Sequence, residues 1–300
     1  MKDVLAIDIG GTEIKVGLIH DNTTLYNKKI YRTRVDGVSL KDRVINILRE
    51  NITSDIRAIA VSTAGQVDSN SGLVIDAVGE SFVGWKGTNI KELIMEEFNL
   101  PSVVENDANC AAIAEGVSGA GKDIKNFVLI TIGTGIGGGV FVDGNLLKGS
   151  CGIAGELGHL LVDIRQENGE RKIEKWEKYA STTSLVNRIK DSLNLQDDID
   201  GRWVFNELKK GNEEVRIKYN EWIYDLSLGL TTLIHIFNPE MIIIGGGISA
   251  QGNILIEPIE KQIKKLAMKA FTEDLKVVAT KQNNDAALWG AYFLSEIEKL

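Results

Sequence analysis

The feature that constrains this chain most is a strand, a glycine–threonine turn and a second strand that occur twice. The apolar run Val4–Ile9 precedes Gly10-Gly11-Thr12, and the apolar run Phe127–Ile132 precedes Gly133-Thr134-Gly135. Each turn leads into another strand-like segment. The two turns begin 123 positions apart (133 − 10), which is the length of a domain. The repeat therefore predicts two related α/β halves.

We place the N-terminal α/β domain at residues 1–122 and the C-terminal α/β domain at residues 123–300. A closing helix is expected over about residues 285–300, and this helix is free to pack back on the N-terminal domain. No linker or low-complexity stretch separates the two halves, so the domains are expected to follow each other directly.

Charge and composition exclude several classes of protein. The 300 residues contain 34 Lys and Arg against 42 Asp and Glu, and a net charge of −8 disfavours binding to nucleic acid. No apolar stretch approaches the roughly 20 residues that cross a bilayer, and acidic residues interrupt the start where a signal peptide would be apolar. Cys110 and Cys151 form no Cys-x-x-Cys pair. We expect a cytoplasmic protein without a membrane partner.

Two glycine patterns resemble nucleotide motifs but lack the required context. Gly116-x-x-x-x-Gly121-Lys122 is followed by Asp123 instead of a hydroxyl, and it comes after a helix, so we interpret it as a helix-terminating turn. Gly133-x-Gly135-x-x-Gly138 leads into the strand-like run Val140–Val142 instead of a helix. A dinucleotide loop must open a helix, so this interpretation is excluded.

The two glycine–threonine turns carry chemistry that suits phosphate. Glycine lets backbone N–H groups approach phosphate oxygens, and Thr12 adds a hydroxyl donor. Asp8 is a candidate Mg²⁺ ligand, acting through water, and Lys15 adds positive charge. A plain hairpin turn is the alternative, but the second turn at Gly133-Thr134-Gly135 favours phosphate binding. The amides of Gly245-Gly246-Gly247, between a strand and a helix, are candidates for the nucleotide as well.

Asn106 and Asp107 stand where the strand Val103-Val104 gives way to a helix. We expect Asp107 at the N-cap, where the helix N-terminus keeps its carboxylate ionised and able to accept a proton from a hydroxyl. Asn106 offers a donor and an acceptor, which suits one sugar hydroxyl. The alternative is a purely structural cap with a turn asparagine.

Five motifs together resemble the ROK family of bacterial sugar kinases and related sugar-responsive repressors. They are Asp8–Thr12, Glu105–Asn109, Ile132–Gly139, Gly155–His159 and Ile244–Gly247, and Ala286–Tyr292 resembles the closing helix of the family. The resemblance implies an actin/hexokinase-like (ribonuclease H-like) fold, with duplicated α/β domains flanking an ATP and sugar cleft. It further implies transfer from Mg-ATP to a sugar hydroxyl, usually the 6-hydroxyl, and leaves a homodimer open.

The resemblance also assigns site residues. It implies that Asp107 is the base, that Gly65 lies in the substrate loop, and that the sugar is contacted by Asn106, Glu156, His159 and Glu177. Mg-ATP would then lie on the residues named above for phosphate: Asp8, Gly10, Gly11, Thr12, Lys15, Gly133, Thr134, Gly135, Gly245, Gly246 and Gly247.

The chain departs from the family at two places. Most ROK proteins hold a structural zinc with a histidine and three cysteines, but Leu160–Trp176 contains no cysteine. The acidic candidates in that stretch are Asp163, Glu167, Glu170 and Glu174, hard oxygen ligands that suit such a site poorly, so we expect no zinc. Ile173 and Trp176 are expected to anchor the stretch by burial. The loop Gly79–Gly84 also differs from the family, so it does not identify the sugar.

The leading hypothesis is an ATP-dependent hexose or N-acylhexosamine kinase, with N-acetylmannosamine or glucose as the sugar and a β-glucoside third. A sugar-sensing ROK regulator is the alternative, although only seven residues precede Asp8 in this sequence and leave no room for a DNA-binding domain there. A chaperone-type or cytoskeletal ATPase would give no reason for the pairing of Asn106 with Asp107.

Overall fold

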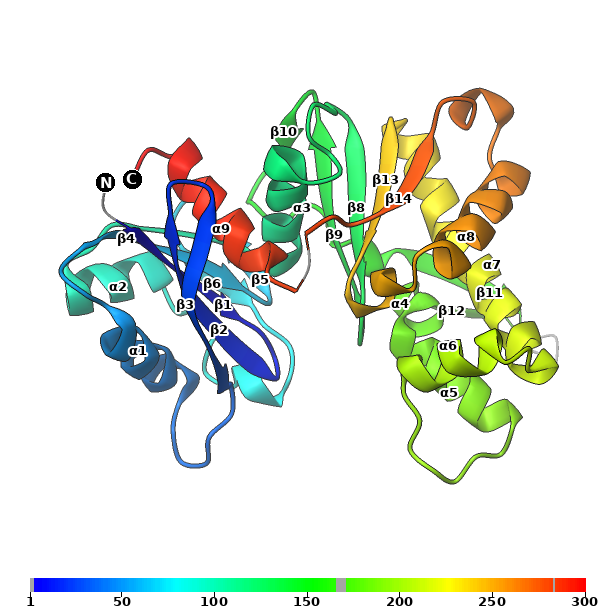
Figure 1. Cartoon of the computed structure of the whole chain (residues 1–300), viewed down its shortest axis with the longest axis horizontal. Helices are drawn as coiled ribbons and strands as arrows, with labels where there is room; N and C mark the ends of the chain where they lie inside the picture. The colour runs from blue at the N-terminus through cyan, green and yellow to red at the C-terminus, as the bar shows by residue number, and fades with distance from the viewer. Residues whose placement is uncertain (1–2, 166–170, 283) are drawn as a thin grey trace. The chain divides into compact units, whose positions relative to one another are not determined.

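The computed structural model of the chain describes residues 3–165, 171–282 and 284–300 (Figure 1). The chain forms two compact units. The first comprises residues 1–122, 146–154 and 282–300, and the second comprises residues 123–145 and 155–281. The closing helix therefore belongs to the first unit, and so does the segment 146–154, which the sequence-based boundaries had placed in the C-terminal domain.

The first unit is built on a five-stranded sheet in the order β3-β2-β1-β4-β7. β1, β2 and β3 pair antiparallel, whereas β4 pairs parallel with β1 and β7 pairs parallel with β4. The strands are β1 (Asp3–Ile9), β2 (Glu13–His20), β3 (Thr24–Arg32), β4 (Ile56–Thr63) and β7 (Ser102–Asn106). Its helices are α1 (Leu40–Asn51), α2 (Ile90–Phe98), α3 (Asp107–Ser118) and α9 (Ala286–Ile297).

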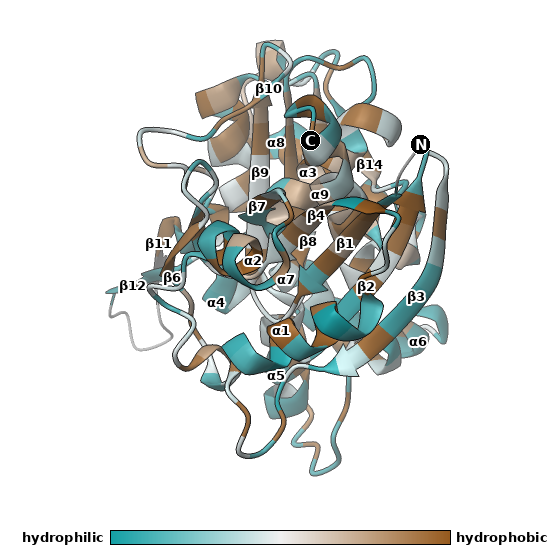
Figure 2. Cartoon of the chain, turned by 90° about the vertical axis from the view of Figure 1, so that its left-hand side faces the viewer, coloured by the Kyte–Doolittle hydropathy of each residue, from teal (hydrophilic) through white to brown (hydrophobic). Residues whose placement is uncertain are grey.

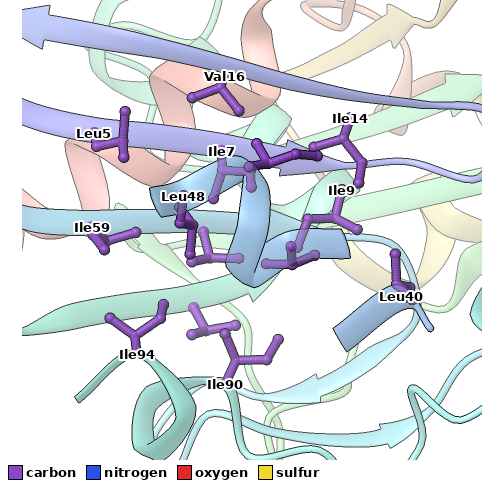
Figure 3. Close-up of a cluster of buried hydrophobic side chains, with 14 of the residues drawn as sticks. Leu5, Ile7, Ile9, Ile14, Val16, Leu40, Leu48, Ile59, Ile90 and Ile94 are labelled. Atoms are coloured by element: carbon purple, nitrogen blue, oxygen red, sulfur yellow. The ribbon is translucent and has the colours of Figure 1, made fainter. Parts of the chain in front are cut away.

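One face of this sheet packs on α1 and α2 through a buried aliphatic cluster. Figure 3 shows Ile7 and Ile9 of β1 beside Ile14 of β2, with Leu48 of α1 near Ile7, and Ile90 of α2 next to Ile94 in the same cluster. Side chains alternate along a strand, so every second residue of β1 enters this cluster. Figure 2 shows β1 mostly brown and the edge strand β3 mostly teal, which matches the exposure of most β3 side chains.

The opposite face of the sheet packs on α9, and α9 packs on α3, although these elements lie at distant points of the chain (Figure 1). Small side chains on β1 and β4, among them Ala6, Ala58 and Ala60, are fully buried there. Gly290 of α9 lies so close to α3 that a Cβ atom would stand 1.7 Å from the Cys110 carbonyl oxygen. Only a residue without a side chain allows this approach.

The second unit repeats the same sheet order, β10-β9-β8-β13-β14, with an antiparallel β8–β9 pair and parallel pairing of β13 with β8 and β14. The duplication expected from the sequence is confirmed. The strands are β8 (Phe127–Ile132), β9 (Ile136–Val142), β10 (Asn145–Leu146), β13 (Met241–Gly245) and β14 (Lys276–Ala279). The helices are α5 (Thr182–Ser192), α6 (Gly201–Lys209), α7 (Glu213–Phe237) and α8 (Asn253–Leu266).

Shorter elements complete both units: β5 (Gln66–Asp68), β6 (Leu73–Asp76), β11 (Leu161–Arg165), β12 (Arg171–Lys175), α4 (Glu177–Ala180), and the 3₁₀ turns η1 (Glu80–Phe82), η2 (Leu157–His159), η3 (Gly247–Gln251) and η4 (Lys269–Phe271). The sequence analysis did not identify the β5–β6 and β11–β12 hairpins, whose strands are short or exposed. Among the described helices, none is both long and apolar enough to cross a membrane.

The glycine pattern that starts at Gly116 is a helix end, as predicted. The Glu115 carbonyl accepts the N–H groups of Gly119 and Gly121 at 3.0 Å, and the Glu115 carboxylate accepts that of Ala120 at 2.5 Å. These three amides are therefore engaged within the chain, which is how a helix C-terminus satisfies its backbone groups.

The contact between α3 and α9 gives a stability prediction. Gly290→Ala forces the two helix backbones apart, and we expect it to lower the free energy of unfolding by about 3 kcal/mol, the upper range for overpacking a core. Urea unfolding measures this change. Ile297→Ala on the same helix is the control, because Ile297 is 62% exposed and its truncation removes little packing. Equal stability of Gly290→Ala and the wild type would contradict the described contact.

Candidate functional site

The first glycine–threonine turn connects β1 to β2 and places Asp8 beside Lys15. The two residues are direct partners in the strand register, with Lys15 Nζ 3.4 Å from Asp8 Oδ2. Ser62 Oγ donates to Asp8 Oδ1 at 2.9 Å, and Lys15 also donates to the Asn284 carbonyl at 2.9 Å. Burial raises the pKa of Asp8, and Lys15 and Ser62 partly oppose that rise. The site thus holds a buried carboxylate next to one cation.

Within this turn, Gly10 has little space for a side chain. Its N–H donates to the Glu13 carbonyl, and a Cβ on Gly10 would stand 3.0 Å from that same oxygen. Gly11 and Thr12 are exposed, and the Gly11 carbonyl accepts the Ser81 hydroxyl at 2.6 Å. The turn is therefore a tight hairpin that presents Gly11 and Thr12 on its outside.

The start of α3 corrects one expectation. The N-cap is Asn106, not Asp107, because Asn106 Oδ1 accepts the N–H groups of Ala108 at 2.9 Å and Asn109 at 3.1 Å. Asp107 is the first residue of the helix, half-buried, and its Oδ1 accepts the Ala108 N–H at 2.9 Å. The carboxylate still lies at the positive end of the helix dipole, since the shift is a single position.

Asn106 also joins the predicted substrate loop. Its Nδ2 donates to the Gly65 carbonyl at 2.9 Å. Gly65 has a φ of +102°, and a Cβ there would stand 2.6 Å from the Asp76 carbonyl oxygen, so glycine is required. Asn106 thus uses both ends of its amide inside the protein, and among the described residues the second N–H of Nδ2 has no acceptor.

In the second unit, Glu156, His159 and Glu177 gather around η2 and the start of α4. His159 Nε2 lies 3.9 Å from Glu177 Oε1, and Lys175 Nζ lies 3.4 Å from the same nitrogen. The His159 N–H donates to the Glu156 carbonyl at 3.1 Å, so one 3₁₀ turn, η2, connects the two residues. Lys175 had no role in the sequence analysis.

The carboxyl group of Glu156 has a raised pKa. Partial removal of water is the largest cause, and the nearby Glu177 carboxylate adds to it, whereas His159 and Lys175 act in the opposite direction. Two carboxylates, one imidazole and one ammonium group therefore share a small region. Such a group can exchange several hydrogen bonds with a polyhydroxyl ligand.

Glu177 also contacts the second glycine–threonine turn. Its Oε2 accepts the Ile136 N–H at 3.4 Å, and a Cβ on Gly135 would stand 2.5 Å from the same oxygen. A Cβ on Gly133, in contrast, would meet no atom of the described residues within 4 Å, and the φ of Gly133 is not positive. The predicted sugar-binding carboxylate and the predicted phosphate turn are thus adjacent within one unit.

A cavity of about 430 Å³ opens beside this turn. Its walls include Gly133, Thr134 and Gly247 of the predicted nucleotide residues. The volume lies in the range of small-molecule sites, and the open space at Gly133 and Gly247 leaves room for phosphate oxygens, so the walls suit a nucleotide. Gly135, Gly245 and Gly246 are not among its lining residues.

Much of this cavity was not identified from the sequence. The additional walls are Ile132, Thr182, Thr183, Val186, Ile199, Asp200, Gly201, Arg202, Phe205, Ile248 and Gln251. Asp200 caps α6 by accepting the Trp203 N–H at 2.9 Å, and Ile199 and Asp200 also line the cavity. No motif marks these positions, since they converge only in the fold.

Gly245 and Gly246 are glycines for packing. Gly246 has a φ of +82°, and a Cβ there would stand 2.3 Å from the Ile132 carbonyl oxygen. A Cβ on Gly245 would meet Thr280 at 3.0 Å. These two residues let β13 end closely beside β8, and only Gly247 reaches the cavity.

The stretch that replaces the zinc loop of the family contains the β11–β12 hairpin. In the described part of the chain, no three His, Cys, Asp or Glu side chains are grouped as metal ligands, but Glu167 and Glu170 lie outside the described residues. Trp176 is fully buried against Gly229 and donates to the Asp225 carbonyl at 3.0 Å, as an anchor should. Ile173 is 67% exposed, so its expected anchoring role is wrong.

Two duplicated α/β units with glycine–threonine turns, a cavity beside one of them and a capped carboxylate in the other define an actin/hexokinase-like phosphotransferase. The sequence model of the ROK family matches residues 4–297. The chain therefore belongs to the ROK family.

Relatives support this membership over nearly the whole chain. A β-glucoside kinase of Listeria monocytogenes is 33% identical over 302 residues, covering 98% of each chain. A glucokinase of Halalkalibacterium halodurans is 31% identical over 314 residues, covering 97% of this chain and 94% of the relative.

Solved structures agree with the fold. A ROK glucokinase of Streptomyces griseus in complex with glucose and AMPPNP has a TM-score of 0.83 and 28% identity, with 98% of this chain and 99% of that chain covered. A Listeria monocytogenes protein provisionally described as an N-acetylmannosamine kinase has a TM-score of 0.85 and 28% identity, with 99% and 100% covered.

Two N-cap variants, one in the candidate site and one outside it, distinguish an effect on stability from an effect on activity. Asn89 caps α2 by accepting the Glu92 N–H at 3.2 Å and has no place in the candidate site. We expect Asn89→Ala and Asn106→Ala each to lower the free energy of unfolding by about 1–2 kcal/mol, the usual effect of losing an N-cap. Only Asn106→Ala should also reduce kinase turnover. Unchanged turnover in Asn106→Ala would remove the α3 corner from the site.

Proposed function

We propose that this protein transfers the γ-phosphoryl group of ATP to the 6-hydroxyl of a hexose or N-acylhexosamine, with N-acetylmannosamine and glucose as the first candidate sugars. Membership of the ROK family and the kinase relatives make it an ATP-dependent sugar kinase. The choice of hydroxyl and of sugar is the proposal.

The observation that carries the proposal is the position of Glu177. One of its oxygens accepts the Ile136 N–H at the glycine–threonine turn, and the other lies 3.9 Å from His159. A carboxylate that touches both groups suits an enzyme whose sugar hydroxyl must stand close to the phosphate it receives. Glu156 and His159 then supply further hydrogen bonds to the sugar ring.

The nucleotide is proposed to occupy the cavity lined by Gly133, Thr134 and Gly247. Gly10, Gly11 and Thr12 of the first turn are proposed to contact the phosphates as well. Asp8 would hold Mg²⁺ through water, because a buried carboxylate next to the hydroxyl of Ser62 offers hard oxygen ligands. Mg²⁺, when bound, would neutralise charge on the phosphates during transfer.

Asp107 is proposed as the general base. Its carboxylate accepts the Ala108 N–H at the start of α3, and the helix dipole favours the ionised form that can accept a proton. The sugar hydroxyl gives its proton to Asp107 as its oxygen bonds to the γ-phosphorus, and the bond to the ADP oxygen breaks. Positioning and charge neutralisation then supply most of the rate, as in other phosphoryl transfers.

A β-glucoside is the second candidate substrate, favoured by the 33% identity to a β-glucoside kinase over nearly the whole chain. A phosphorylation screen over glucose, N-acetylglucosamine, N-acetylmannosamine, fructose and cellobiose distinguishes the candidates. We expect ATP consumption that depends on one hexose or N-acylhexosamine and yields its 6-phosphate. ATP consumption that is independent of every sugar would contradict the proposal, and a preference for cellobiose would select the second candidate.

The base assignment is tested by Asp107→Asn, which is nearly isosteric. Sugar and ATP should still bind, while kcat falls by at least about 100-fold, the usual contribution of a positioned base. Asp42→Asn is the matched control, because Asp42 is an exposed carboxylate in the first turn of α1. A kcat of Asp107→Asn within a few-fold of the wild type would exclude the base role.

A further inference from the structure

We propose that the buried Glu105 and the partly exposed Lys148 form a charge pair that holds Asp107 in its working orientation, so that Lys148 is a positioning residue for phosphoryl transfer. This inference rests on the proposed function. In the sequence analysis Glu105 appeared only as the first residue of the motif Glu105–Asn109, and Lys148 had no role. Neither residue is part of the groups assigned above to sugar or nucleotide.

Glu105 fixes the corner between β7 and α3. It is 0% exposed, and its Oε1 accepts the Asn106 N–H at 2.8 Å and Asn109 Nδ2 at 3.0 Å. One oxygen therefore clips the last residue of the strand to the first turn of the helix. Asp107 lies between these two points of attachment, so the direction of its side chain depends on them.

The other carboxylate oxygen of Glu105, Oε2, has an unusual environment. Oε2 is buried and has no hydrogen-bond partner in the part of the chain that the structure describes. Lys148 Nζ lies 3.6 Å away and provides the opposite charge. A buried carboxylate is strongly unfavourable without such a partner, so Lys148 is what allows Glu105 to remain in place as an acceptor.

Lys148 is held at this position from several sides. Its Nζ donates to Ser69 Oγ at 2.8 Å, and its carbonyl accepts the Ala154 N–H at 3.2 Å. Lys148 belongs to the segment 146–154, which is part of the first unit although residues 123–145 and 155–281 on either side of it form the second. Glu156 lies two positions after the end of this segment. The pair thus ties the corner that carries Asp107 to the segment that leads to the proposed sugar residues.

Loss of the ammonium group should act on Asp107 through Glu105. A carboxylate without its cation turns toward water, and the Asn106 N–H and Asn109 Nδ2 then lose their common acceptor. Small displacements of a catalytic group have large effects on rate, of the order of 100-fold for about 1 Å. The effect should appear in kcat, while the cavity proposed for the nucleotide is untouched.

The experiment is a double-mutant cycle with Lys148→Met, Glu105→Gln and the double variant, assayed with the preferred sugar. We expect Lys148→Met to lower kcat by about tenfold or more with the KM for ATP within about twofold, and Lys148→Arg to retain most of kcat. Glutamine at position 105 keeps an acceptor oxygen without the charge, so the double variant should be at least about fivefold more active than the product of the single effects predicts.

Lys190→Met is the control, because Lys190 pairs with exposed Asp198 at 3.1 Å and its loss should leave kcat unchanged. A Lys148→Met enzyme with wild-type kcat, or single effects that simply multiply, would overturn the inference. If Glu105→Gln does not fold, the contrast between Lys148→Met and Lys148→Arg decides, and equal loss in both overturns the charge pair. A wild type that uses no sugar would instead contradict the proposed function.

Discussion

The first turn of α3 starts against the end of a buried strand, so its backbone N–H groups must find acceptors inside the protein. Asn106 provides one oxygen for two of these N–H groups, and Glu105 provides another for the Asn106 N–H itself. A corner with so many fixed donors has little freedom. Asp107 is consequently presented in one direction, and the proposed chemistry depends on that direction.

In the second unit, a different residue, Glu177, fixes the backbone beside the glycine–threonine turn. The backbone of the turn between β8 and β9 is held by a carboxylate from α4, because Glu177 accepts the Ile136 N–H. Trp176, the residue before Glu177, is fully buried against Gly229, so the start of α4 cannot shift freely. In both units a glycine–threonine turn connects a pair of aliphatic strands. This strand–turn–strand motif is what the chain repeats. The side chains around the two turns differ, and the proposed function uses this difference: its proton acceptor, Asp107, lies in the first unit, and Glu156, His159 and Glu177 lie in the second.

The sequence predicted well whatever depends on local pattern. The glycine–threonine turns predicted the duplicated sheets, and the glycine pattern at Gly116 predicted the end of α3. Features that depend on tertiary contact were missed or displaced. Asn106 takes the N-cap position that was expected of Asp107. Its Nδ2 donates to the Gly65 carbonyl, a contact between distant residues that no local sequence pattern shows. Ile199 and Asp200 line a cavity although their stretch is polar, and Lys148 meets Glu105 across 43 positions (148 − 105) with no motif to announce it.

The central claim is that Asp107, fixed by its corner, receives the proton of the sugar hydroxyl. A crystal structure with the preferred sugar and a non-hydrolysable ATP analogue tests it most directly. The account predicts an Asp107 carboxylate oxygen about 2.6–3.2 Å from the accepting hydroxyl, the reach of a general base, with Glu105 still bound to the Asn106 N–H. A sugar whose accepting hydroxyl lies beyond that reach, with another side chain in contact with it, would contradict the account.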